Sequence, residues 1–229
     1  MHNSSPPWLE ILNPQVKTGK VRYALFDFDG TISVIRRGWE TIMSALMLES
    51  IGGGNPLPAA VEAEVNAYID RSTGILTILQ MHWLAEAVRR HGLVEKPLNA
   101  AEYKRIYNER LLQPVRARLS RLNGSPAERE KLMIAGANAF LGELSARGVR
   151  LFLASGSDHE YVVQEAETLG VLDYFEGRVF GAKGDSVTDS KELVIARILD
   201  ENPLQGEELL VVGDGPVEIR CARSVGAIA

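Results

Sequence analysis

The chain has 229 residues, of which 45% are hydrophobic and 24% are charged, and its formal net charge is −5 at pH 7. This length supports one sizeable hydrophobic core, or a core with a smaller second domain. The negative net charge argues against a general nucleic-acid binder, because the protein and a polyanion repel each other.

The N-terminal segment, residues 1–20, contains Pro and Ser and is expected to be mostly irregular. It lacks the basic and apolar regions of a signal peptide, and no run of the chain approaches the roughly 20 apolar residues of a membrane span. The single cysteine, Cys221, cannot form an internal disulfide and is expected to be a small apolar residue on a helix. We therefore expect a cytoplasmic protein that binds no membrane.

The first predicted strand is the apolar run VRYALFDF at residues 21–28. A continuous apolar run is typical of a strand buried on both faces of a parallel sheet. Two carboxylates, Asp27 and Asp29, stand at its end. They can approach one site, because side chains two positions apart on a strand point the same way. Residues 29–38 are expected to form a turn and a short flap.

From about residue 39 to residue 147 the apolar positions recur at helical spacing. Breaks rich in Gly, Pro or small polar residues separate the helical segments. The breaks lie at residues 51–58, 71–74, 91–97 and 123–126. The expected helices are residues 39–48, 59–70, 75–90, 100–121 with an interruption around Pro114, and 127–147.

After residue 147 the pattern changes to alternating strands and helices. Residues 148–158 and 207–215 are each expected to form a strand that runs into a turn, and residues 174–181 are expected to hold a short strand. The expected helices are residues 159–169, 189–201 and 216–226. The final residues, GAIA, look like the beginning of one more strand. Such alternation predicts an α/β fold with a parallel sheet covered by helices on both faces, and with a helical insert after the first strand.

Polar groups lie at the ends of three of the predicted strands: Asp27 and Asp29 at the end of the first, Ser155 at the end of a second, and Asp214 at the end of the last. In open parallel sheets, ligands bind beyond the C-terminal ends of the strands. Two neighbouring carboxylates repel each other unless a cation balances them. Mg²⁺ prefers oxygen ligands and usually takes one or two carboxylates together with water and phosphate. The sequence therefore predicts a Mg²⁺ site here, which Asp214 can complete.

These residue types permit phosphoryl chemistry. Once a metal balances the charge, one carboxylate can attack phosphorus as a nucleophile, and the second can act as general acid and base. For the phosphate, Ser155 offers a hydroxyl and the turn at Gly156 offers backbone N–H groups. Lys191, near the start of a predicted helix, offers a positive charge.

Four motifs in this order resemble those of the haloacid dehalogenase superfamily of phosphohydrolases. They are DFDGT, LFLAS, SKELVIARIL and LVVGDGPVE, and together they span residues 21–229. The helical insert resembles that family's helical cap in position, and phosphoglycolate-phosphatase-like enzymes are the nearest likeness. The resemblance implies a Rossmann-like core at residues 1–35 and 145–229, and an all-α cap domain at residues 36–144.

The resemblance also implies roles for the acidic residues. Asp27 resembles the family's nucleophile, which forms an aspartyl-phosphate, and Asp29 resembles the acid/base. The carboxylates of Asp27 and Asp214 and the backbone carbonyl of Asp29 would hold Mg²⁺. Glu218 stands where many members have a second acid that assists the metal through water, and it can equally be a first-turn Glu that favours the helix dipole.

The resemblance further implies that Ser155 and Lys191 bind the phosphoryl group. Thr31, together with Gly30, would shape the turn after the nucleophile and is counted among the phosphate-binding residues. In the insert, the break at residues 71–74 resembles a loop that faces the active site in capped members. Arg71 is therefore a candidate for the far end of the substrate.

The sequence assigns no single role in the site to several other polar residues. Arg36 and Arg37, which leave the flap, are either substrate-binding or solvated. Asp158 is expected to cap the helix that follows it. The histidines show no metal-ligand spacing and are expected to be solvated or packed; they include His82, His91 and His159.

The resulting prediction is a Mg²⁺-dependent phosphomonoesterase that acts on a small phosphorylated metabolite. A phosphomutase of the same superfamily and a catalytically idle phosphate-binding module remain as alternatives, although no motif residue is missing. Asp29 argues against a dehalogenase, and a phosphonate hydrolase lacks an identifiable Schiff-base lysine in the cap. The substrate and the oligomeric state stay open, and the resemblance implies that family members usually continue beyond GAIA.

Overall fold

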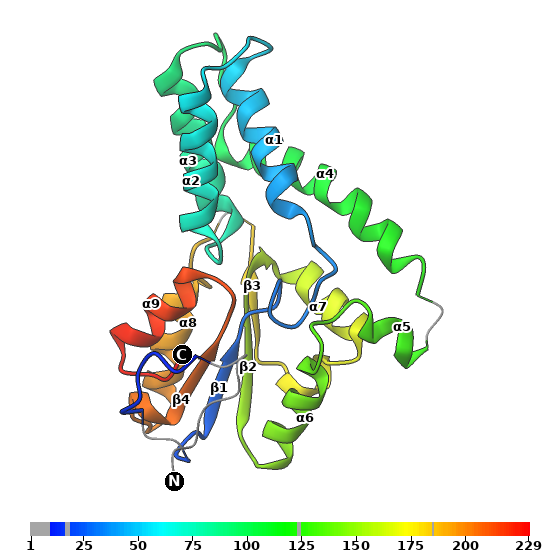
Figure 1. The fold of residues 1–229 in the computed structure, drawn as a ribbon, viewed down its shortest axis with the longest axis vertical. Coiled ribbons are helices and arrows are strands. Elements are labelled where there is room, and N and C mark those ends of the chain that lie inside the picture. Colours follow the sequence, from blue (N-terminus) through cyan, green and yellow to red (C-terminus); the bar gives the residue numbers. More distant parts are fainter. Residues whose placement is uncertain (1–9, 17–18, 123–124, 185) are drawn as a thin grey trace.

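The computed structural model describes residues 10–16, 19–122, 125–184 and 186–229. Figure 1 shows an α/β part that contains the labelled strands, and a group of long helices above it. No helix among these described residues is long and apolar enough to cross a membrane.

Among the described residues, the sheet contains four parallel strands in the order β3-β2-β1-β4. The strands are β1 (Tyr23–Phe26), β2 (Arg150–Asp158), β3 (Val179–Ala182) and β4 (Leu209–Val212). The central strand β1 pairs with both β2 and β4, so that Tyr23 lies opposite Arg150 and Leu209. The predicted parallel sheet is confirmed, and the carboxyl ends of its strands share one edge.

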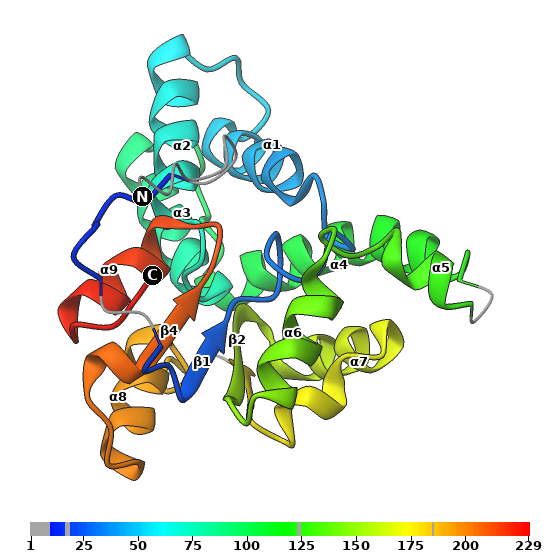
Figure 2. The ribbon, with the colours of Figure 1, turned by 60° about the horizontal axis from the view of Figure 1, so that its bottom comes forward.

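Both faces of β1 are buried, as its apolar run predicts. Ala24 and Phe26 belong to one hydrophobic core, whereas Tyr23 and Leu25 belong to another, because alternate side chains of a strand point to opposite faces. Two helices cover each face (Figures 1 and 2). They are α6 (Ala137–Ala146) and α7 (His159–Leu169) on the first face, and α8 (Lys191–Glu201) and α9 (Pro216–Ser224) on the second.

The insert after β1 begins with four long helices that lie beyond the carboxyl edge of the sheet (Figure 1). They are α1 (Trp39–Gly52), α2 (Ala59–Ser72), α3 (Thr77–His91) and α4 (Ala100–Leu119). α1 packs against the other three, and α3 packs against α4. The apolar stripe of α3 is internal packing: Met81 and Leu84 are fully buried, and the Trp83 ring stacks on Tyr68 with centroids 3.9 Å apart.

The expected interruption at Pro114 is wrong, because α4 runs through this residue without a break. Proline removes one backbone donor from a helix interior. The neighbouring Leu111, Leu112 and Val115 are all buried, and their packing holds the helix together despite that loss.

The expected single helix at residues 127–147 is also wrong. The short helix α5 (Pro126–Glu130) begins at Ser125, whose side chain accepts from the Glu128 N–H, and α6 begins only at Ala137. Residues 123–124 of the expected break lie outside the described residues. The intervening segment pairs with the flap instead: Val34 N–H donates to Leu132 O and Ile134 N–H donates to Ile32 O, each at 2.9 Å.

Two further boundaries, the end of α1 and the last residues of the chain, differ little from the prediction. α1 continues past the predicted residue 48 to Gly52, where Gly53 adopts a left-handed conformation and closes the helix with its N–H. At the other end of the chain, Ile228 pairs in parallel with Leu210 of β4, so the start of one more strand is confirmed as a single bridge.

The division between core and cap stays a prediction. α6 packs on β2 and on the 3₁₀ helix η1 (Leu172–Phe175), and α5 packs on α7. We therefore propose that the cap consists of α1 to α4 and ends near residue 120, because the later helices of the predicted insert contact the sheet-bearing part.

Candidate active site

The end of β1 places Asp27 inside the protein. Its backbone N–H donates to Val212 O of β4 at 2.8 Å, which continues the strand pairing by one residue. Asp27 is only 5% exposed. Burial raises the pKa of Asp27 to about 7; the Lys191 ammonium opposes this rise, and the Glu218 carboxylate adds to it.

Lys191 lies between two buried carboxylates. It is the first residue of α8, which Ser190 caps by accepting from the Leu193 N–H. Its Nζ is 2.8 Å from Asp27 Oδ1 and also donates to Glu218 Oε1. Burial alone lowers the pKa of Lys191, but Asp27 and Glu218 together raise it above its ordinary value. The lysine is therefore a fixed cation at the predicted nucleophile.

Asp214 approaches the turn after β1 from the end of β4. Gly30 has φ +83°, and a Cβ there would overlap Asp214 Oδ2 and lie 2.6 Å from its Cγ. Glycine is thus required at residue 30 for both its backbone conformation and the approach of the carboxylate. Burial raises the pKa of Asp214, and the Glu218 carboxylate adds to the rise.

Asp29 is held by the end of β2. Its Oδ2 accepts from the Ser157 hydroxyl at 3.0 Å and from the Ser155 hydroxyl at 3.3 Å. The Ser157 N–H donates to Ser155 Oγ at 3.1 Å, so the two serines are ordered together. On the other side, Arg36 Nε is 3.6 Å from Asp29 Oδ1. The structure thus brings both predicted aspartates and the predicted serine to one place.

Arg36 belongs to a buried ion pair that the sequence did not reveal. Its Nε donates to both oxygens of Glu165 at 3.1 and 3.2 Å, and its Nη2 donates to Glu165 Oε1 at 2.8 Å. Arg36 Nη1 also donates to Ser157 Oγ at 3.1 Å. One signal for Glu165 was present: it shares a helical spacing with the buried Val162, Ala166 and Leu169, where a charge needs a buried partner.

Residues 73–77, which join α2 to α3, form a segment that rests on the core; we call it the cap loop. The Thr77 hydroxyl donates to Gly156 O at 3.2 Å. A Cβ on Gly156 would overlap Ile75 O, and a Cβ on Gly215 would lie 2.9 Å from Thr73 O. Two core glycines therefore permit the close approach of the cap loop to the strand ends.

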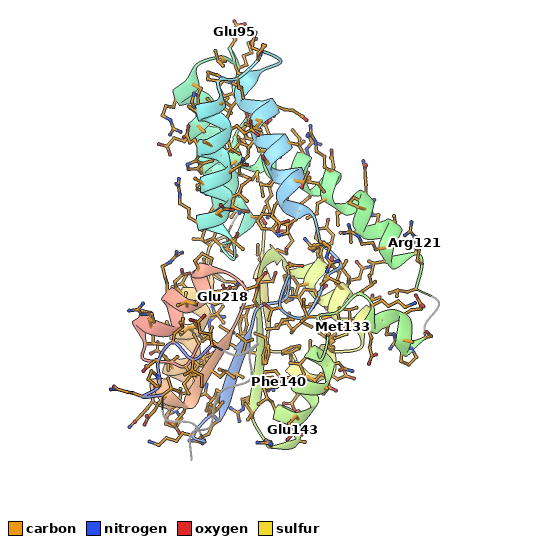
Figure 3. All side chains as sticks on the ribbon, in the orientation of Figure 1. Glu95, Arg121, Met133, Phe140, Glu143 and Glu218 are labelled. Atoms are coloured by element: carbon orange, nitrogen blue, oxygen red, sulfur yellow. The ribbon has the colours of Figure 1, made fainter. Side chains whose placement is uncertain are left out.

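The cap loop and the strand ends enclose a cavity of about 60 Å³. The core side is lined by carboxylates and β2 residues, and the cap side by residues of α1, the cap loop, α3 and α4. Glu218 lies at the top of the α/β part in Figure 3, below the long helices. The cavity thus lies between the two parts of the molecule, at the carboxyl edge of the sheet.

The donor set at this edge suits a divalent cation. No group of three or more His, Cys, Asp or Glu side chains in the described residues has the arrangement of a metal site. The predicted set, however, uses only two carboxylates, those of Asp27 and Asp214, with the Asp29 carbonyl, and Mg²⁺ takes few protein carboxylates. Glu218 Oε2 is buried and finds no hydrogen-bond partner among the described residues. The concentrated negative charge and this orphaned oxygen fit a cation with its bound water.

Three predicted residues lie away from the cavity. Arg71 is exposed on the last turn of α2, and its guanidinium lies 5.1 Å from the centroid of the Tyr68 ring. Thr31 has a buried hydroxyl that makes no hydrogen bond within the part of the chain that the structure describes. Asp158 does not cap α7 with its side chain, which is a correction. Its carboxylate instead accepts from Asn108 and pairs with Lys104, both on α4.

The other side chains considered in the sequence do not line the cavity. Arg37 and His82 are exposed. His91 lies 3.1 Å from a Glu64 carboxylate oxygen, and His159 Nδ1 is buried with no hydrogen-bond partner in the described ranges. Cys221 is buried on α9, as expected.

Comparison with known proteins identifies related sequences over most of the chain. The phosphoglycolate phosphatase of Yersinia pseudotuberculosis serotype I (strain IP32953) is 24% identical over 211 residues, which cover 92% of this chain and 80% of that protein. The phosphoglycolate phosphatase of Escherichia coli (strain K12) is 26% identical over 215 residues, which cover 90% and 79%.

Solved structures share the fold. A predicted phosphoglycolate phosphatase from Haemophilus somnus 129PT superposes with a TM-score of 0.60 at 16% identity, over 92% of this chain and 84% of that one. A β-phosphoglucomutase from Clostridium difficile superposes with a TM-score of 0.59 at 13% identity, over 90% and 82%. The Rossmann-like core with a helical cap is thus confirmed as the fold class. The family model of haloacid dehalogenase-like hydrolases matches residues 21–226, and the chain belongs to this family.

Proposed function

We propose that the chain is a Mg²⁺-dependent phosphomonoesterase that acts on a small phosphorylated metabolite through an aspartyl-phosphate on Asp27. The observation that carries this proposal is the position of Asp27: it is buried at the carboxyl edge of the sheet, 2.8 Å from Lys191 Nζ and beside the cavity. The phosphoglycolate phosphatases among the relatives support the same reaction class.

In the first half-reaction, an Asp27 carboxylate oxygen attacks phosphorus, and the bond from phosphorus to the substrate oxygen breaks. Asp29 donates a proton to that leaving oxygen, which departs as an alcohol. Lys191 and the Ser155 hydroxyl bind the phosphoryl oxygens. The hydroxyls of Ser155 and Ser157 hold Asp29 in place through Oδ2.

In the second half-reaction, Asp29 takes a proton from water, and the water oxygen attacks phosphorus. The bond between phosphorus and Asp27 breaks, so that inorganic phosphate and the free carboxylate are restored. When bound to Asp27, Asp214 and the Asp29 carbonyl, Mg²⁺ would balance the carboxylate charge and that of the phosphoryl group. The cap would limit access of bulk water to the cavity.

A phosphomutase is the second candidate, because a β-phosphoglucomutase shares the fold. It would use the same aspartate pair but return the phosphoryl group to another hydroxyl of the substrate. Release of inorganic phosphate in excess over enzyme separates the two reactions. We also propose a cytoplasmic location, since the single cysteine, Cys221, cannot form an internal disulfide.

Hydrolysis of p-nitrophenyl phosphate with and without Mg²⁺ tests the proposal. We expect Mg²⁺-dependent turnover in the wild type and none above background in Asp27→Asn, with a covalent phosphate on the wild-type enzyme detected by intact-mass measurement. Asp200→Asn is the matched control: it makes the same change at an exposed residue of α8 and should keep wild-type activity. Turnover that survives in Asp27→Asn would refute the proposed nucleophile.

A further inference from the structure

The charges around the cavity are unevenly distributed. Among the described residues that line it, three are carboxylates, namely Asp27, Asp29 and Asp214, and one is a cation, Arg36. Lys191 lies behind Asp27, where the phosphoryl group is expected to bind. Any second anionic group of a substrate would therefore depend on Arg36 for compensation.

Arg36 is already compensated. Its guanidinium makes three hydrogen bonds to Glu165 and one to Ser157, and it also faces Asp29 at 3.6 Å. Arg36 is 5% exposed and Glu165 is 2% exposed, so water screens neither charge. Glu165 alone balances the charge of Arg36, so the guanidinium offers no uncompensated positive charge to a second anionic group, even when Asp29 carries the proton for the leaving oxygen.

The rest of the cap side is neutral and able to hydrogen bond. Gln80 lines the cavity at 4% exposed, and its amide nitrogen donates to Ser72 Oγ at 3.1 Å, so this part of the lining is polar but uncharged. Thr77 and Tyr107 bring hydroxyls to the lining, and Trp39 and other apolar side chains complete it. Acceptor oxygens and hydroxyls match the O–H groups of a polyol or sugar.

We propose that the substrate is a phosphate monoester whose remaining groups are neutral and hydroxylated, and that the Arg36–Glu165 pair makes the site discriminate against a second anionic group. This inference rests on the proposed phosphatase function. A carboxylate in the cavity would be buried beside Asp29, and the described residues around it, Arg36 and Lys191, are cations already paired with carboxylates, so its burial is costly. A hydroxyl at the same place loses its hydrogen bonds to water but can donate to acceptor oxygens of the protein.

A matched pair of substrates tests the inference. 2-Hydroxyethyl phosphate and 2-phosphoglycolate differ only in carrying a hydroxymethyl or a carboxylate group next to the phosphoester carbon. We expect kcat/KM of the wild type to be at least about tenfold higher for 2-hydroxyethyl phosphate. Equal or better hydrolysis of 2-phosphoglycolate, by an enzyme that turns over p-nitrophenyl phosphate, overturns the substrate class and leaves the phosphatase function intact. Failure with all three esters refutes both.

A variant tests the role of the ion pair. Glu165→Gln keeps the size of the side chain but removes the carboxylate that balances the charge of Arg36. The ratio of kcat/KM for the two esters should therefore shift toward 2-phosphoglycolate by about tenfold. Glu143→Gln, at the exposed Arg147 pair on α6, is the control and should leave the ratio unchanged. If circular dichroism shows that Glu165→Gln is folded and its ratio of kcat/KM for the two esters is unchanged, the proposed role of the pair is overturned. The wild-type comparison decides the substrate class even where that variant does not fold.

Discussion

Gly156 lies where the cap loop rests on the core, and Gly156→Ala tests whether this contact forms during catalysis. The new Cβ would overlap Ile75 O and lie 3.0 Å from the Ile75 carbonyl carbon. Restoring ordinary contact of 3.4–4 Å at that carbon requires the cap loop to retreat by 0.4–1 Å, and the oxygen requires more. The hydrogen bond from Thr77 to Gly156 O, now 3.2 Å, would be lost.

The expected effect is on activity rather than on stability. A misplacement of about 1 Å can lower a catalytic rate by about 100-fold, whereas one net hydrogen bond contributes about 1 kcal/mol to stability. We therefore expect kcat/KM for p-nitrophenyl phosphate to fall by about 100-fold, while the melting temperature changes by only a few degrees.

Gly142→Ala is the matched control for this prediction. Gly142 lies within α6, and its nearest neighbour for a new Cβ is the end of the Tyr174 side chain at 3.3 Å. Alanine is favoured over glycine inside a helix, so activity should persist. Wild-type kcat/KM in a folded Gly156→Ala protein would mean that catalysis does not require the cap loop in this position.

Three further outcomes are expected. Lys191→Met should destabilise the protein by about 3–5 kcal/mol in urea unfolding, because Asp27 and Glu218 lose their buried cation; a loss below about 1 kcal/mol would contradict this. Mg²⁺ should raise the melting temperature of the wild type but not of Asp214→Asn, and an equal rise in both would exclude Asp214 as a ligand. Asn99→Ala should cost about 1 kcal/mol in the same urea experiment by removing the capping box of α4, and an unchanged midpoint would contradict it.

Local patterns predicted much of the core. The apolar run before Asp27 and the helical spacing of α7 specified a buried strand and an amphipathic helix, and both are present. Asp29, Ser155 and Asp214 were predicted to lie at one edge of the sheet because each stands at a strand end, and they lie there in the structure. These inferences succeeded because each depends on residues close in sequence, or on the general geometry of parallel sheets.

Other features depend on contacts between distant segments. The helix expected at residues 127–147 is broken because its middle pairs with the flap, about a hundred residues earlier. The Arg36–Glu165 pair joins residues 129 positions apart. Arg71 was placed near the substrate by analogy, but the packing of α2 turns it to the surface beside Tyr68. No local periodicity contains this information.

The pairing between the flap and residues 132–134 has a consequence for how the chain folds. The backbone bonds from Val34 to Leu132 and from Ile134 to Ile32 join the flap that follows β1 to the segment that leads into α6. Once they form, the segment between them is closed off, and the effective connection from β1 to the parallel strand β2 consists of the flap, the residues after 132 and α6. The entropic cost of bringing these neighbouring strands together is then set by this shorter connection and not by the full length of the insertion. A foreign helical segment grafted between residues 34 and 132 should accordingly leave the sheet intact.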